Sequence, residues 1–279
     1  MLRQRIITAL ILVALLLPAL FHAAPEPLAG LTLVLIAAGA WEWGRLNQLD
    51  FKSAMGLALA CLALCGLSWA QGWPWQPSLL LWQIAGGCWV LAGAWLLRQG
   101  VAGWPHIPRA LRCVAGVLAL WLTWLAVFQA KVMGSNFLLS MLVLVWMADV
   151  AAYFAGRAFG HRKLAPGISP GKSWEGVYGG MAGVLLLALA WIAADQRWSL
   201  EAPSLFTHLL HLGWFGGLLG LLFLTVMSVV GDLVESLVKR SAGMKDSSQL
   251  LPGHGGVLDR VDALLPTLPL ALMLVQASA

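Results

Sequence analysis

The stretch FLLSMLVLVWMADVAAYFAGRAFG, from Phe137 to Gly160, decides the fold class because it is almost entirely apolar. Its charged residues are Asp149 and Arg157, and every other side chain in it is uncharged. A hydrophobic stretch of about 20 residues is long enough to cross the hydrocarbon core of a bilayer as a helix. The stretch therefore predicts a transmembrane helix over 136–156 with an ionisable residue inside it.

The composition of the whole chain extends this interpretation. The chain has 279 residues, of which 60% are hydrophobic and 10% are charged. A soluble globular protein carries about 25% charged residues, so this chain has too few polar side chains to cover a water-soluble body. Because only helices and closed barrels satisfy their backbone in lipid, long apolar runs favour an all-α integral membrane protein.

The apolar runs predict a polytopic bundle of about nine transmembrane helices in one integral membrane unit. The connections are short, and neither a long linker nor an internal repeat separates soluble domains. The predicted spans are 5–22, 27–45, 54–71, 78–97, 111–130, 136–156, 176–194, 212–232 and 263–278.

The basic residues predict the orientation of the bundle. If the N-terminus is cytoplasmic and the spans alternate, 15 of the 17 Lys and Arg residues fall on the cytoplasmic side. The other side keeps Lys131 and Arg197. Cytoplasmic loops of membrane proteins carry an excess of Lys and Arg, so we expect a cytoplasmic N-terminus. A basic cytoplasmic face suits anionic headgroups or phosphorylated solutes, and its dispersed charge does not indicate nucleic-acid binding.

The charged end of the span over 212–232 is the first candidate site. In VVGDLVESLVKR, Asp232, Glu235, Ser236 and Lys239 are spaced at i, i+3, i+4 and i+7, which places them on one face of a continuing helix. An unpaired carboxylate near lipid is costly. The alternative interpretation is a simple Glu235–Lys239 helix pair, with Asp232 solvated among the headgroups.

The stretch that follows, PGHGGVLDRVD, combines a turn with acidic residues. Glycines on either side of His254 break helix and strand and let backbone N–H groups approach a phosphate. Asp259 and Asp262 flank Arg260 at i, i+3, an arrangement that repels itself without a cation. Magnesium is typically held by one or two carboxylates and by substrate phosphates. The alternative is a solvated loop. The basic residues expected to neutralise phosphates here are Lys239, Arg240, Lys245 and Arg260.

Two further acidic residues lie in or at the end of predicted spans. Asp149 has Tyr153 at i+4 and Arg157 at i+8, close to the same helix face. An ionisable residue inside a span indicates a functional site by default; the alternative is a structural contact with Tyr153 or Arg157. Glu42, near the cytoplasmic end of the second span, either joins the site or pairs with Arg45.

Gly171-Lys172-Ser173 looks like the end of a phosphate-binding Walker A loop. That motif requires glycine at position 166, where this chain has proline. Ser169 before Pro170 instead predicts a helix N-cap with proline in the first turn. Such a helix would point its N-terminus, with Lys172 and Ser173, at an anion.

These residues resemble a known family. SLVKRSAGMKDSSQLLPGHGGVLDRVD, from Ser236 to Asp262, resembles the signature of the phosphatidate cytidylyltransferase family, also called CDP-diacylglycerol synthase. That signature is Ser, two residues, Lys-Arg, four residues, Lys-Asp, then His-Gly-Gly and Asp-Arg-x-Asp, and every fixed position is met. WMADVAAYFAGRAFGHRKLAPGISPGKSWEGVYGG, from Trp146 to Gly180, resembles a second block of that family. The first half of the chain matches in general character alone.

The resemblance implies the reaction of CTP with phosphatidate to give CDP-diacylglycerol and pyrophosphate at the cytoplasmic face of the bacterial inner membrane. It implies Mg²⁺, with a second cation such as K⁺ as a further candidate, and a homodimer among membrane lipids. We then expect residues 1–135 to supply packing helices and a lipid groove, and residues 136–279 to carry the catalytic loops.

The resemblance also assigns residue roles. By it, Asp232 and Asp259 bind the metal. The expected catalytic residues are Asp232, Asp259, Lys239, Arg240, Lys245, Asp246, His254 and Arg260. The expected substrate-binding residues are Asp149, Lys172, Ser173, Ser236, Gly255, Gly256 and Asp262.

Two other functions stay open on the sequence. One is a CTP-dependent kinase or transferase that acts on a polyprenyl lipid, which would differ in lipid selectivity. The other is a transporter or channel in which Asp149 and the Asp232 region line a pathway. Transporters usually show broken or polar helices at mid-membrane positions, whereas the charges of this chain gather at one side, which favours an enzyme at the membrane interface.

Overall fold

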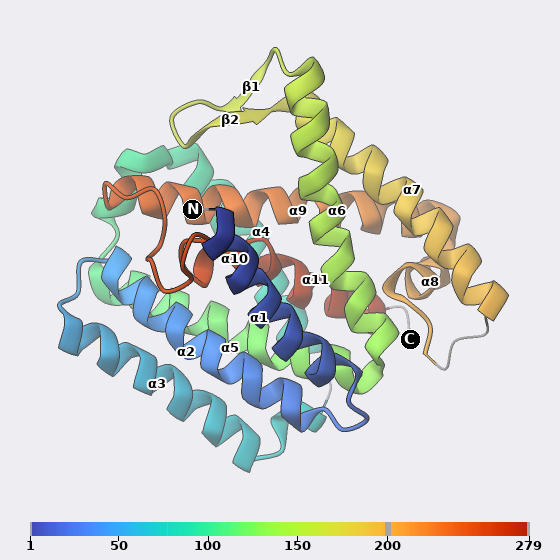
Figure 1. The fold of residues 1–279 in the computed structure, drawn as a ribbon, viewed down its shortest axis with the longest axis horizontal. Helices are drawn as coiled ribbons and strands as arrows, with labels where there is room; N and C mark the ends of the chain where they lie inside the picture. The colour runs from blue at the N-terminus through green and yellow to red at the C-terminus, as the bar shows by residue number, and fades with distance from the viewer. Residues whose placement is uncertain (1, 77, 199–201, 278–279) are drawn as a thin grey trace.

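The computed structural model of the protein describes residues 2–76, 78–198 and 202–277, which form a bundle of helices with one small hairpin (Figure 1). The all-α polytopic fold is confirmed. The long helices are α1 (Leu2–Phe21), α2 (Glu26–Leu46), α3 (Phe51–Ala70), α4 (Leu79–Gly103), α5 (Arg109–Met133), α6 (Ser135–Phe159), α7 (Trp174–Trp198), α9 (Gly213–Ser241) and α11 (Leu264–Ala277). The short helical elements are η1 (Trp73–Trp75), η2 (Trp104–His106), α8 (Leu205–Leu209), η3 (Leu210–Leu212) and α10 (Leu258–Val261).

Each of the nine predicted spans coincides with a helix. Within the described residues, seven helical segments, from α2 to α9, are long and apolar enough to cross a membrane. The last helix, α11, has 14 residues, and at about 1.5 Å per residue it is shorter than a hydrocarbon core of about 30 Å. Residue 278, at the end of the last predicted span, lies outside the described residues. The chain is thus an integral membrane protein, and nine crossings stay a prediction.

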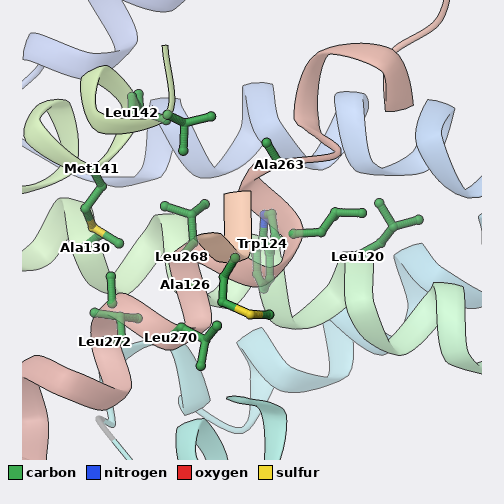
Figure 2. Packing of buried hydrophobic residues seen from close by; sticks show 14 of the residues in the cluster. Leu120, Trp124, Ala126, Ala130, Met141, Leu142, Ala263, Leu268, Leu270 and Leu272 are labelled. Carbon is green, nitrogen blue, oxygen red and sulfur yellow. The ribbon is translucent and has the colours of Figure 1, made fainter. Parts of the chain in front are cut away.

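Helix α11 lies in the middle of the bundle, where it packs against α4, α5 and α9. Figure 2 shows its residues Leu268, Leu270 and Leu272 among buried side chains of α5 and α6, including Trp124 and Met141. These three leucines are fully buried. Because the centre of the bundle holds α11, the segment before it, residues 242–262, is held across one end of the bundle.

The start of α1 lies at that same end. The Thr8 hydroxyl donates a hydrogen bond to the carbonyl of Pro252 (3.0 Å), which joins α1 to the segment that leads into α10. The topology predicted from the sequence has the same arrangement, because alternating spans put the N-terminus and the charged loops on one side of the membrane. That this side is cytoplasmic stays a prediction.

The hairpin corrects one sequence-based prediction. Strands β1 (Lys163–Ala165) and β2 (Ser169–Ser173) pair antiparallel, with Lys163 opposite Ser173. Ser169 is therefore a strand residue, and the predicted N-cap at that position is wrong. The turn at Pro166-Gly167, with Ile168 N–H donating to Ala165 O (3.1 Å), lets the segment fold back and pair. A proline within β2 is compatible with an edge position in so small a sheet.

The cap of α7 is Ser173 instead. Helix α7 begins at Trp174, and Ser173 Oγ accepts a hydrogen bond from the N–H of Gly176 (3.1 Å). A serine hydroxyl in this position satisfies one of the free N–H groups of a helix start. Ser173 is buried and joins the hairpin to α7, and Lys172, the residue before it in β2, is partly buried.

Candidate functional site

The end of α9 carries the residues that the sequence placed on one face. Helix α9 runs unbroken through Asp232, Glu235, Ser236 and Lys239. Lys239 Nζ is ion-paired with Glu235, and Ser236 Oγ donates to Asp232 Oδ1 (3.2 Å). The Glu235–Lys239 pair of the alternative interpretation is thus present, but Lys239 has a second partner and Asp232 is not simply solvated.

Asp232 contacts the hairpin across the bundle. Lys172 Nζ lies 2.5 Å from Asp232 Oδ2, and both side chains are about three-quarters buried. Lys172 and Asp232 line a cavity of about 450 Å³ between α6, α7, α9 and β2, together with Asp149 and Arg157. The structure therefore brings residues of the block over 146–180 to one cavity with Asp232 of α9, which lies 60 residues from Lys172 in sequence.

Asp149 faces this cavity without the helix partners that the alternative required. Arg157 Nη1 donates to the hydroxyl of Tyr153 (3.1 Å), and among the described residues neither side chain hydrogen-bonds to Asp149. Asp149 is exposed and lies near enough to Lys172 and Asp232 to interact with both charges. The Asp149–Arg157 and Asp149–Tyr153 contacts are therefore wrong, and Asp149 stays available to a ligand.

Asp262 adds a third carboxylate to this end of the bundle. Its backbone oxygen lies against Gly231, so closely that a Cβ at Gly231 would stand 2.5 Å from it. Burial, and then the charge of Asp232, raise the pKa of Asp262 well above its ordinary value. The ionised forms of Asp149, Asp232 and Asp262 would repel one another, and a bound cation would relieve that repulsion.

The glycine turn before α10 is held by its own backbone and by Arg260. Gly253 and Gly255 have φ of 78° and 83°, values that favour glycine. Leu251 N–H donates to Gly255 O (2.9 Å), and Arg260 Nη2 and Nε donate to the carbonyl of His254 (2.6 and 3.1 Å). Arg260 is thus engaged with the turn. His254 Nδ1 is buried and has no hydrogen-bond partner in the described part of the chain.

Asp259 is the most heavily bonded carboxylate of the signature segment. Its Oδ1 lies 2.5 Å from Lys239 Nζ, and its Oδ2 accepts from Ser247 N–H (2.9 Å), Ser247 Oγ (2.9 Å) and Gly256 N–H (2.7 Å). Burial alone would raise the pKa of Asp259, but the hydrogen bonds from Lys239, Gly256 and Ser247 outweigh it and lower the pKa below its ordinary value. Asp259 is therefore a fixed anion next to the glycine turn.

Glu42 is a site residue that sequence reasoning placed only as one of two alternatives. Arg45 does not pair with it: Arg45 Nη1 donates to the carbonyl of Leu49 (2.8 Å). Glu42 is fully buried and accepts from Ser247, Ser248, Val257 and Leu258. An acidic residue at the end of an apolar run was the available signal. No sequence pattern indicated that Ser247 would contact both Glu42 and Asp259.

Three predicted site residues lie at the surface. Arg240, Lys245 and Asp246 are exposed, and Arg240 Nη1 donates to the carbonyl of Met244 (3.2 Å). Exposed charges can attract a charged solute before it binds. The structure therefore places Asp149, Lys172 and Asp232 at one cavity and pairs Lys239 of α9 with Asp259, whereas these three residues stay at the surface.

The acidic side chains at this end of the bundle are the groups that could hold a metal ion. In the described ranges, no group of three or more His, Cys, Asp or Glu side chains is arranged to hold a metal by itself. Magnesium usually keeps one or two protein carboxylates and takes its other ligands from water and phosphate oxygens. Asp232 and Asp259 offer such oxygens, and each now faces a lysine.

We predict that Gly256→Ala will destabilise the protein. A Cβ at Gly256 would overlap Ser247 Oγ and the Glu42 carboxylate, and both groups are buried and hydrogen-bonded. Overpacking of this kind costs about 1–3 kcal/mol. The measurement is the midpoint of thermal unfolding in detergent. Gly167→Ala is the matched control, because it adds the same methyl group to open space. Equal midpoints for the two variants would contradict the close packing at Gly256.

Comparison with known proteins gives a consistent result. A family model described as the cytidylyltransferase family matches residues 3–278. A protein of Pseudomonas aeruginosa is 39% identical and covers 100% of this chain and 98% of its own length. One of Haemophilus influenzae is 36% identical, covering 96% of each. One of Brucella suis is 36% identical, covering 85% of this chain and 80% of its own. All three are named phosphatidate cytidylyltransferase.

Proposed function

This chain belongs to the cytidylyltransferase family, and we propose that it is a phosphatidate cytidylyltransferase. The reaction joins CTP and phosphatidate to give CDP-diacylglycerol and pyrophosphate. The observation that carries the proposal is the convergence of two lysine–carboxylate pairs, Lys172–Asp232 and Lys239–Asp259, at one end of a membrane bundle beside a glycine turn. The names of the relatives support the choice of substrates.

The chemistry needs little more than positioning and charge stabilisation. An oxygen of the phosphatidate phosphate attacks the α-phosphorus of CTP, a new P–O bond forms, and the bond to the β-phosphate breaks to release pyrophosphate. Charge on the transferring group spreads over its oxygens, and fixed cations stabilise it. Lys172 and Lys239 are the cations nearest the carboxylates, and the free Nδ1 of His254 is a further polar contact.

Asp232 and Asp259 would hold Mg²⁺, which would neutralise phosphate charge and orient the reacting oxygens. The lysines that now face these carboxylates would then be released to contact phosphate oxygens. The exposed Arg240 and Lys245 would be the first residues to contact the nucleotide, and Asp149 and Asp262 would bind substrate or cation nearby. A second cation such as K⁺ and a homodimeric assembly belong to the same proposal.

The site belongs at a membrane surface, because one substrate is a lipid and the other a soluble nucleotide. We place it at the cytoplasmic face of the bacterial inner membrane, on the distribution of basic residues. The position of the lysine pairs at the end of the bundle, rather than midway along the helices, supports an enzyme over a transporter.

We predict that Lys172→Met will lower kcat/KM by about 10- to 100-fold, because the variant loses one charge-assisted hydrogen bond to a substrate phosphate. The experiment uses purified protein in detergent, with CTP, Mg²⁺ and phosphatidate, and measures CDP-diacylglycerol. Lys163→Met is the matched control, since Lys163 is exposed on β1 of the same hairpin. Wild-type protein that makes no product would refute the proposed function. An active wild type with an equally active Lys172→Met variant would remove Lys172 from the site.

A further inference from the structure

Glu42 connects the N-terminal half of the chain to the signature segment. It lies near the end of α2, and its side chain is completely shielded from solvent. Its hydrogen-bond partners lie between 205 and 216 residues away in sequence, in the segment that leads into α10. An anion buried so fully needs compensation by hydrogen bonds, and the signature segment supplies them.

The bonds to Glu42 are divided evenly between its two oxygens. Oε1 accepts from the N–H of Val257 (2.9 Å) and the hydroxyl of Ser248 (2.5 Å). Oε2 accepts from the N–H of Leu258 (2.8 Å) and lies 3.2 Å from the Oγ of Ser247, whose single hydroxyl proton it shares with Asp259. The two N–H groups stand where α10 begins and have no carbonyl partner within a helix. Glu42 therefore joins two parts of the segment to α2. One is the start of α10, and the other is Ser247 and Ser248, which precede the glycine turn.

Ser247 carries this connection onward to Asp259. Ser247 Oγ lies 3.2 Å from Glu42 Oε2 and 2.9 Å from Asp259 Oδ2, and Ser247 N–H also donates to Asp259. Gly256 sits between them, with no room for a side chain against Glu42 or Ser247. The orientation of Asp259 thus depends on a segment whose position is set by Glu42.

We propose that Glu42 is a positioning residue, which fixes the segment 247–258 so that Asp259 and Lys239 face the reacting phosphates. The proposal rests on the proposed function. It assigns to α2 a part in the site, beyond packing and a lipid groove. Glu42 itself does not touch the reacting atoms; it acts through Ser247 and the backbone of Val257 and Leu258.

The isosteric change Glu42→Gln tests this role sharply. Each oxygen of Glu42 accepts one backbone N–H, so either orientation of the glutamine amide sets its NH₂ group against the N–H of Val257 or of Leu258. A residue that served only to fill space would tolerate glutamine, which has nearly the same shape. The matched control is Glu26→Gln, the same change at an exposed position at the start of α2.

The experiment combines turnover with hydrogen–deuterium exchange on purified protein in detergent. We expect Glu42→Gln to lower kcat by about 10- to 100-fold, because a small misplacement of Asp259 relative to the substrate slows the reaction by about this factor. The KM for CTP should change less. Exchange should quicken in peptides covering 247–258 and stay at the wild-type rate in α5 and α6. Combining Glu42→Gln with Ser247→Ala should cost less than the product of the single effects, because both act on Asp259.

Three results would overturn the proposal: wild-type kcat in Glu42→Gln, wild-type exchange over 247–258, or faster exchange spread evenly through the helices. The last would make Glu42 a residue of general stability. A wild type that made no CDP-diacylglycerol would refute the proposed function instead, and the exchange comparison would still decide whether Glu42 holds the segment.

Discussion

Asp259→Asn is expected to lower kcat/KM by about 10³-fold while the fold is retained, which is the upper end of the loss typical for one preorganised polar group in an active site. The asparagine oxygen can stay toward Ser247 and Gly256, which preserves the bonds of Oδ2 to the segment. Its NH₂ group then faces the Lys239 ammonium, where Oδ1 now accepts. The variant thus loses the counter-charge of Lys239 and one proposed metal ligand together.

The control for this prediction is Asp50→Asn. Asp50 caps α3 through the N–H of Ser53 (3.4 Å) and is exposed, and asparagine is an equally good cap. Both variants should elute as folded protein, and only Asp259→Asn should lose CTP-dependent synthesis. Activity within a few-fold of wild type in Asp259→Asn would remove Asp259 from the metal site and leave the reaction unaffected.

Lys239→Met is expected to reduce stability by about 3–5 kcal/mol as well as activity, because it leaves buried carboxylates without their cation. The side chains of Glu235 and Asp259 are 3% and 7% exposed, and Lys239 is the ion-pair partner of both. The measurement is the unfolding midpoint in detergent. Arg240→Met, at the next and exposed position, should change stability by no more than about 0.5 kcal/mol.

A double variant separates the two effects of Lys239. Replacing a buried ion pair by apolar residues is often neutral for stability, so Lys239→Met with Glu235→Leu should recover much of the lost stability. It should stay inactive, because Asp259 still lacks its partner and the phosphates still lack a cation. Recovery of activity along with stability would mean that Lys239 serves the fold alone.

Much of the fold follows from local patterns. Helices lie over all nine predicted segments, because a long apolar run favours a helix that can bury it in a bilayer, while the number of membrane crossings stays a prediction. The face of α9 was predictable because the spacing of Asp232, Ser236 and Lys239 fixes their direction on a helix. The hairpin was missed because Ser169-Pro170 fits a helix start as well as an edge strand, and pairing with Lys163–Ala165 decided between them.

The sequence predicted which residues belong to the candidate site better than it predicted which of them contact one another. Lys172 and Asp232 were both candidates, but their pairing joins positions 60 residues apart and depends on how α6 and α7 place the hairpin. Glu42 lies over 200 residues from its partners, and no local pattern distinguishes it from an acidic residue at a membrane surface. The phosphate-binding role of Arg260 stays a prediction, and no local pattern indicated that Arg260 would also donate to the carbonyl of His254.

The most direct test of the account follows the phosphorus atoms of CTP. Purified protein in detergent is given phosphatidate and CTP labelled at either the α- or the γ-phosphorus. Cytidylyl transfer predicts that the α label enters the lipid and that the γ label leaves in pyrophosphate. A γ label in the lipid would identify a CTP-dependent kinase instead, and no label in the lipid from either CTP would contradict an enzyme of this class and favour a transporter.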